Sequence, residues 1–144
     1  MVTMYNRSCV AVEQAKDALN KVGRDDAYLD LACFLTQQAI EFLMKAILSE
    51  YGVAYDKTHD ILALLELLRS INFEFEQEDS LELLATTITD WEESSRYGKG
   101  IRTGVQTVQS VHNIYKSMNA AFLQKVEENN MEADSGFDFQ SKKK

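Results

Sequence analysis

One stretch of sequence decides the fold of this chain: AYLDLACFLTQQAIEFLMKAILSEYGVAYDKTHD, from Ala27 to Asp60. Its first part predicts a long helix that is apolar over most of its circumference. Such a helix needs cover on several sides, so we expect it at the centre of a helical bundle. Only a thin polar strip on it is left for solvent or for a partner, formed by Asp30, Gln37, Gln38, Glu41 and Lys45.

Helices are also predicted on both sides of this stretch. The chain has no proline, the commonest helix breaker, and no run in which β-branched and polar residues alternate as in a strand. Apolar residues at helical spacing predict five helices: about Thr3 to Val22, Asp25 or Asp26 to Tyr51, Thr58 to Ile71, a helix from Ser80 that is interrupted at Arg96, and Thr103 to Glu128. We therefore expect an all-α protein, an antiparallel up-and-down bundle of four long helices plus one short helix.

The length of 144 residues fits a single domain that buries its own core. Helical periodicity fails from Asn129 onward, which is typical of a loose end of the chain. We therefore expect residues 1–128 to form the bundle and residues 129–144 to form a disordered tail.

Composition restricts the classes of function. A formal net charge of -8 argues against a broad surface that holds nucleic acid by charge alone, although a small local basic site remains compatible with it. Cys9 and Cys33 fall in apolar helical patterns and are predicted to be reduced core residues. No close set of ligands predicts a metal, and no cofactor is expected. Without a secretory signal or an apolar run of about 18 residues, we expect a cytoplasmic protein that does not span a membrane.

The segment RYGKGIRTG, from Arg96 to Gly104, is the strongest candidate for a ligand site. It gathers three basic residues, Arg96, Lys99 and Arg102, in front of a predicted helix start. Free N–H groups at a helix start attract anions, and arginine binds phosphate through two hydrogen bonds. We predict phosphate contact by these three residues and stacking by Tyr97. The alternative is a flexible turn between helices whose charges offset the nearby Glu92 and Glu93.

The two histidines each allow two interpretations. His59 lies in Thr58-His59-Asp60, which is better explained as a helix start, with Thr58 as cap and Asp60 in the first turn, than as a catalytic site. His112 lies on the apolar side of the last helix, where a core or interface histidine is the usual case. It would also titrate in the range of a general base.

The same residues carry a family resemblance. Gln38-Ala39-Ile40-Glu41, Lys45-Ala46-Ile47-Leu48, Thr58-His59-Asp60-Ile61 before a leucine-rich helix, and Arg96-Tyr97 resemble HEPN domains over roughly residues 5 to 126. The resemblance implies a helical bundle that commonly dimerises. It also implies one of two roles: pairing with a minimal nucleotidyltransferase, as in toxin–antitoxin-like modules, or metal-independent ribonuclease activity.

The ribonuclease motif of this family is an arginine followed, after four to six residues, by a histidine on the last helix. Here nine residues separate Arg102 from His112, nearly three helical turns, which departs from the motif. The sequence therefore predicts a non-catalytic HEPN-type domain, a homodimer that binds a nucleotidyltransferase partner or a nucleotide or other phosphate ligand. A toxin-like ribonuclease acting on RNA through Arg102 and His112 is the alternative, and a purely structural dimerisation module is a third possibility.

Overall fold

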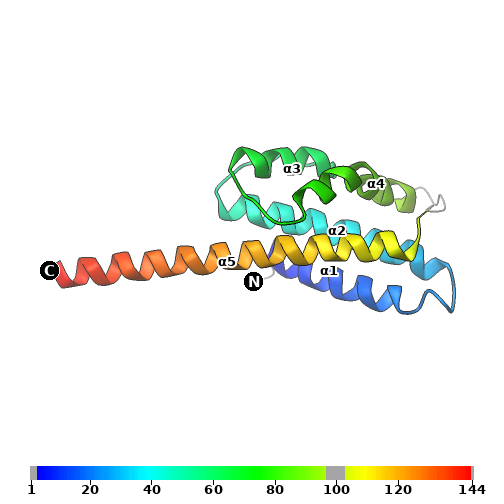
Figure 1. Cartoon of the computed structure of the whole chain (residues 1–144), viewed down its shortest axis with the longest axis horizontal. Helices are drawn as coiled ribbons and strands as arrows, with labels where there is room; N and C mark the ends of the chain where they lie inside the picture. Colours follow the sequence, from blue (N-terminus) through cyan, green and yellow to red (C-terminus); the bar gives the residue numbers. More distant parts are fainter. Residues whose placement is uncertain (1–2, 97–102, 144) are drawn as a thin grey trace.

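The computed structural model describes the backbone of residues 3–96 and 103–143, and the side chains of residues 3–94 and 103–131 (Figure 1). Every regular element within these ranges is a helix, which confirms the all-α prediction. The helices are α1 (Met4–Leu19), α2 (Ala27–Glu50), α3 (Ile61–Ser70), α4 (Glu78–Arg96) and α5 (Val105–Lys143).

Helix α2 is the centre of the molecule, as its apolar circumference predicts. It packs against each of the other four helices. Its largest fully buried side chains are Ile40, Leu43, Met44, Ile47 and Leu48. Each buried aliphatic side chain of this size contributes about 1.5–3 kcal/mol relative to an exposed one, so α2 supplies much of the driving force for folding.

By length and composition alone, α2 would also suffice to cross a membrane. The helix has 24 residues, and its most apolar window has a mean hydropathy of 1.4. Within the bundle, however, 72% of that window is buried. This is the pattern of a core helix covered by its own chain, as the opening stretch predicts.

Helices α1 and α5 lie along α2 and are tied to each other by buried polar groups. The Oγ atom of Ser8 on α1 lies 2.9 Å from both the carbonyl oxygen of Ala39 and the Oη atom of Tyr115 on α5. One turn away, the Tyr5 hydroxyl donates to Oδ1 of Asn119 at 2.9 Å. These contacts join the two ends of the folded chain across the central helix.

The direction of α3 differs from the expected up-and-down order. The chain turns at Gly52, whose φ of 69° is a left-handed conformation that glycine adopts readily. It then runs back along α2, so that His59, just before α3, meets Glu41 in the middle of α2. Phe73, just after α3, packs edge-on against Tyr51. Helices α2 and α3 therefore point the same way, and alternation fails at this step.

Helix α4 pairs with α3 in the opposite direction. Near the end of α3, Arg69 donates to Glu82 at 2.8 Å, and at the start of α3 the Ile61 amide donates to Thr89 Oγ1 at 3.0 Å. Together α3 and α4 form a second layer over α2, on the opposite side from α1 (Figure 1). This layer encloses the site described below.

Helix α5 extends well past Glu128, where the sequence pattern predicts its end. Its backbone is helical to Lys143, and its C-terminal part, orange to red in Figure 1, projects beyond the other helices. Val126 is the last residue whose described side chain packs against the core. Apolar periodicity detected the packed part of the helix and gave no signal for the part beyond it. The division into a domain of residues 1–128 and a tail stays a prediction.

Candidate functional site

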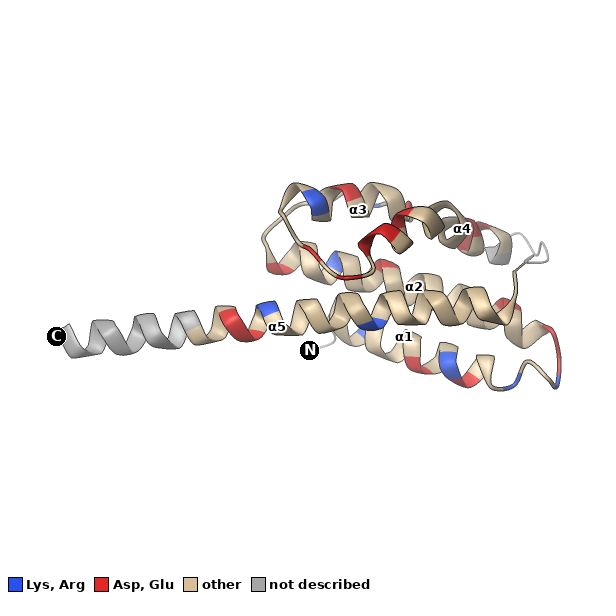
Figure 2. Ribbon diagram, in the orientation of Figure 1, with Lys and Arg blue, Asp and Glu red and all other residues tan. Residues whose placement is uncertain are grey.

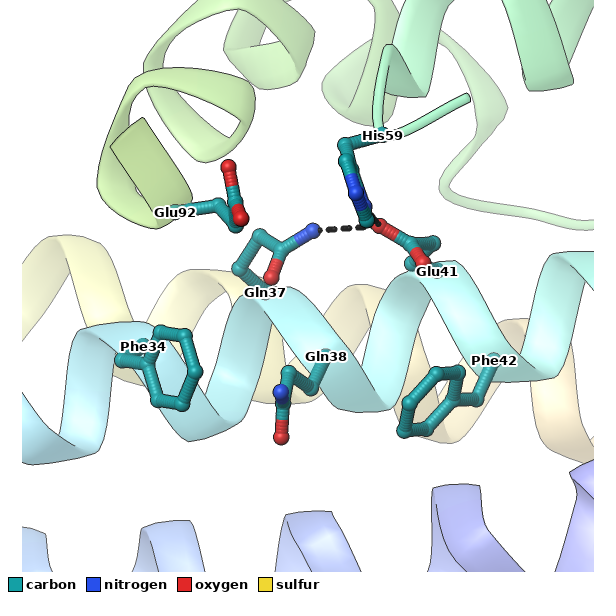
Figure 3. A pocket seen from close by; sticks show the side chains of 7 residues that line it. All are labelled: Phe34, Gln37, Gln38, Glu41, Phe42, His59 and Glu92. Carbon is teal, nitrogen blue, oxygen red and sulfur yellow. Dashed lines mark hydrogen bonds and ion pairs between the residues drawn. The ribbon is translucent and has the colours of Figure 1, made fainter. Parts of the chain in front are cut away.

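A cavity of about 410 Å³ opens between α2 and the layer formed by α3 and α4 (Figure 3). Its lining comprises Phe34, Gln37, Gln38, Glu41 and Phe42 from α2, His59 from the connection before α3, and Glu92 from α4. Figure 3 shows the polar groups facing the α3–α4 side, while the two phenylalanines flank Gln38 on the other side. The volume lies within the range of small-molecule pockets.

Glu41 organises the polar side of this cavity. Its Oε1 accepts hydrogen bonds from Gln37 Nε2 and from His59 Nδ1, both at 2.8 Å, and its Oε2 accepts from Lys45 Nζ at 3.0 Å. The carboxylate is almost fully buried, at 3% exposure. A buried carboxylate is tolerated when opposite charge and donors surround it, and Lys45, Gln37 and His59 meet that need.

The burial of this cluster corrects the expectation for the polar strip on α2. Gln37, Glu41 and Lys45 were expected to face solvent or a partner, yet all three are buried. They lie at four-residue spacing on one side of α2, and the returning connection between α2 and α3 covers that side. The spacing was a usable signal, because three polar residues in line on an apolar helix need common partners.

Gln37 carries an unsatisfied hydrogen-bond acceptor. The residue is 0% exposed, and its Oε1 finds no hydrogen-bond partner among the described residues. Because Nε2 donates to Glu41, the orientation of the amide is fixed and Oε1 is the free end. A buried acceptor without a donor costs about 1–3 kcal/mol. The cavity therefore offers a fixed acceptor to a ligand that brings an N–H or O–H group.

The Thr58-His59-Asp60 tripeptide starts α3, and its middle residue also belongs to the site. Asp60, rather than Thr58, is the N-cap: its Oδ1 accepts from the amides of Leu62 and Ala63, while Thr58 Oγ1 accepts from the Asp60 amide. His59 points to Glu41, and its side chain remains 54% exposed. Because a carboxylate only accepts, Nδ1 carries a proton and donates it to Glu41.

His112 lies apart from this site, in the core between α5 and α2. Its Nε2 is 2.7 Å from Thr36 Oγ1 and is hydrogen-bonded to it. Burial of the ring, with a smaller contribution from the positive charge of Lys16, lowers the pKa of His112 to about 4. The ring is therefore neutral at pH 7, and only 9% of the residue is exposed. The structure does not bring His59 and His112 together.

The basic segment cannot be placed. Tyr97, Lys99 and Arg102 lie outside the described residues. Arg96 is the last residue of α4, and its side chain also lies outside the described part. Phosphate contact and stacking by these four residues stay predictions. Figure 2 shows the described Lys and Arg residues scattered singly over the helices in that view.

A second hollow lies beside the cavity, and we call its surface the α1–α2 face. It is a groove of about 480 Å³ lined by Asn6, Arg7, Val10, Ala11 and Gln14 of α1 and by Leu35, Gln38 and Phe42 of α2. Val10 is 53% exposed, and Leu31, one turn before Leu35, is 45% exposed. Gln38 and Phe42 line both the groove and the cavity, so the two hollows adjoin across α2.

No group of three or more His, Cys, Asp and Glu residues in the described ranges is arranged to hold a metal ion. The cavity therefore presents hydrogen-bonding and ionic groups together with aromatic walls. Its Glu41 carboxylate and the unsatisfied Gln37 Oε1 are acceptors, which suit a ligand that donates hydrogen bonds.

Comparison with known proteins identifies the fold family. The family model for the HEPN domain matches residues 5–129, which includes α1 from its second residue, all of α2 to α4 and the packed part of α5. Neither the curated proteins nor the solved structures contain a significant match to the chain. The match spans most of the sequence, including the stretch from Ala27 to Asp60 and both histidines. The chain therefore belongs to the HEPN domain family.

Proposed function

We propose that this protein is a non-catalytic HEPN domain that forms a homodimer through the α1–α2 face and binds a partner protein as a dimer. The observation that carries the proposal is the apolar character of that face. Val10 and Leu31 are large apolar side chains that remain about half exposed beside a groove floored by Leu35 and Phe42. Contiguous exposed apolar surface on a folded domain commonly marks an interaction site.

A minimal nucleotidyltransferase is the partner that we propose. This part of the proposal rests on the family, because many HEPN proteins pair with a minimal nucleotidyltransferase in a two-protein module. A dimer would present two copies of the remaining surfaces, including the acidic α3–α4 layer, to such a partner. Toxin–antitoxin-like activity of the module and a cytoplasmic location belong to the same proposal.

The placement of His112 favours this proposal over a ribonuclease. A general base has to reach the proton that it removes, within about 3 Å of the substrate. His112 instead is buried and hydrogen-bonded to Thr36. In the family's ribonucleases the histidine acts with an arginine, and here nine residues separate Arg102 from His112 in the sequence.

The dimer is tested by placing a charge at the centre of the α1–α2 face. Val10→Glu should raise the dimer dissociation constant at least tenfold, because a carboxylate would be buried against apolar groups without a partner. Sedimentation equilibrium over a range of concentrations measures it. Leu83→Glu is the matched control, since Leu83 is 84% exposed on α4, away from the face. A parent protein that stays monomeric, or equal effects of both substitutions, would contradict the proposal.

The partner is tested with the same two variants. A minimal nucleotidyltransferase co-expressed with the parent protein should co-purify with it and with Leu83→Glu. If the dimer is required, Val10→Glu should lose the partner. Co-purification that is absent from the parent would remove the nucleotidyltransferase from the proposal and leave the dimer to stand on the sedimentation data.

A further inference from the structure

The cavity beside Glu41 has the chemistry of a guanidinium site. Its unsatisfied group, Gln37 Oε1, is a buried acceptor, and the carboxylate of Glu41 lies on the same polar side. Phe34 and Phe42 supply aromatic surface at its edge (Figure 3). A guanidinium has five N–H donors and no acceptor, carries positive charge, and stacks on aromatic rings.

The α1–α2 face carries a guanidinium with no partner among the described residues. Arg7 is exposed and lines the groove, and no hydrogen bond or ion pair of its side chain occurs among the described residues. Along the chain it adjoins Ser8, whose hydroxyl is bonded to the carbonyl of Ala39. Arg7 therefore lies at the same level of α2 as Gln37 and Glu41, but on the opposite side of that helix.

Two-fold symmetry would bring Arg7 of one copy to the cavity of the other copy. Gln38 and Phe42 separate the groove on the α1 side from the cavity on the α3–α4 side, and Figure 3 shows α1 and α3–α4 on opposite sides of α2. A two-fold axis that runs parallel to α2, beside Gln38 and Phe42, exchanges these sides between the copies. It therefore lays the groove of one copy over the cavity of the other, as an isologous interface requires.

We propose that Arg7 of a second copy of this chain enters the cavity and donates to Gln37 Oε1. Its positive charge is then close to the Glu41 carboxylate, and its planar group lies against Phe34 or Phe42. Each copy contributes one arginine and one cavity, so two such contacts form per dimer. The inference rests on the proposed function, because it needs the α1–α2 face to be the dimer interface.

A double-mutant cycle tests the contact in the full-length protein. Arg7→Ala and Gln37→Met should each raise the dimer dissociation constant about tenfold or more, since each removes one partner of a buried charge-assisted hydrogen bond present twice per dimer. The dimer dissociation constant of the double variant should be no higher than that of the more affected single variant. Either substitution alone already removes the contact, so the second one adds nothing. Arg24→Ala, in the exposed turn between α1 and α2, is the control and should leave the constant unchanged.

Chemical denaturation of each variant keeps the test independent of folding. Gln37→Met also removes a donor to Glu41. Its dimer dissociation constant is therefore compared with that of the parent only if its unfolding midpoint shows that the monomer is folded. Arg7→Lys provides a second reading on an exposed residue: it keeps the charge but lacks the planar fork, and should recover part of the loss.

The outcomes separate this inference from the proposed function. If Val10→Glu dissociates the dimer while Arg7→Ala and Gln37→Met do not, the face is correct and the arginine contact is wrong. Additive effects of Arg7 and Gln37 would also overturn the contact. A parent protein that stays monomeric would contradict both the proposed dimer face and the arginine contact.

Added ethylguanidinium distinguishes the two sources of a guanidinium. If Arg7 occupies the cavity, ethylguanidinium should compete with it and weaken the parent dimer, with little effect on Gln37→Met. Binding of ethylguanidinium to the parent with an unchanged dimer constant would mean that a free guanidinium compound, rather than Arg7, is the natural occupant, and would overturn the inference.

Discussion

His112 shows how burial, helped by a nearby positive charge, makes the stability of a protein sensitive to acid. Its folded-state pKa of about 4 lies below the usual value of 6.5, because burial and Lys16 disfavour the charged ring. The unfolded chain therefore binds a proton between these two values that the folded chain does not bind. Stability due to this group is fully present above about pH 6.5 and is lost as the pH falls towards 4.

His112→Gln should remove this pH dependence while keeping a hydrogen-bonding group near Thr36. The lowered pKa corresponds to a loss in the free energy of unfolding of the parent on the order of 3 kcal/mol as the pH falls from above 6.5 to below 4. Between pH 7 and pH 5 the loss is roughly 2 kcal/mol. Urea unfolding of parent and variant at the two pH values measures it. The difference between the two proteins should shrink at pH 5 by that amount. A constant difference would show that His112 titrates normally in the folded protein.

Residue-level prediction from the sequence succeeded where local spacing decides the role. Most apolar positions in the second half of α2 are buried as predicted, whereas Leu31 is 45% exposed. Thr58-His59-Asp60 does start a helix, although the cap is Asp60. It failed for Gln37, Glu41 and Lys45, whose burial depends on a connection that folds back from more than ten residues away. Periodicity describes one helix at a time and carries no information about what covers it.

Among the helices, α3 depends most on its cap, because it is short and starts from an exposed connection. Asp60 Oδ1 accepts from the amides of Leu62 and Ala63, two of the groups that a helix start leaves without partners. Asp60→Ala should lower the free energy of unfolding by about 1 kcal/mol, within a range of about 0.5–2 kcal/mol. Denaturant unfolding at neutral pH measures the change.

Two matched variants define that effect. Asp60→Asn keeps an oxygen in the capping position and should cost only a small part of the alanine effect. Asp56→Ala removes an exposed carboxylate from the same connection, where no described hydrogen bond is lost, and should stay within about 0.5 kcal/mol of the parent. If Asp56→Ala costs as much as Asp60→Ala, the cap is not the source of the loss.

The existence of the helices was more predictable than their directions. Each helix shows its own apolar spacing, and glycines or polar runs separate the helices, so all five are visible in the sequence. The parallel course of α2 and α3 is not visible, because the pattern gives no sign of a connection that runs back to Glu41. The end of α5 was missed for a related reason: Val126 is the last residue whose described side chain packs against the core, and the apolar pattern ends near it.

Over the whole molecule, charge decides where an anionic ligand can bind. The chain carries a formal net charge of -8, and the described cavity offers acceptors to its ligand, so an anionic ligand would need the basic segment. The sequence predicts phosphate contact there by Arg96, Lys99 and Arg102, with Tyr97 stacking on the base. The residues of that segment lie outside the described part, so this site was predictable only as a cluster in the sequence.

An Arg96→Ala/Arg102→Ala double variant tests this second site. If the parent protein binds a nucleotide such as ATP, we expect the variant to bind at least tenfold more weakly, because two charge-assisted contacts to phosphate are lost. Binding by the parent should also weaken with added salt, because salt screens the attraction between the phosphates and the basic side chains. Titration calorimetry measures both effects. Equal binding by parent and variant, or none by the parent, would contradict the prediction.

The link between the first and the last helix has a consequence for how the chain is made. Ser8 and Tyr115 are 107 residues apart in sequence, and Tyr5 and Asn119 are 114 apart. Synthesis proceeds at about 5–20 residues per second, so the N-terminal helices leave the ribosome several seconds before α5 can cover them. During that interval the side of α2 that α5 will cover is open to chaperones and to other nascent chains. The step most exposed to aggregation is therefore the arrival of α5, and substitutions that weaken its packing should reduce the yield of folded protein during synthesis.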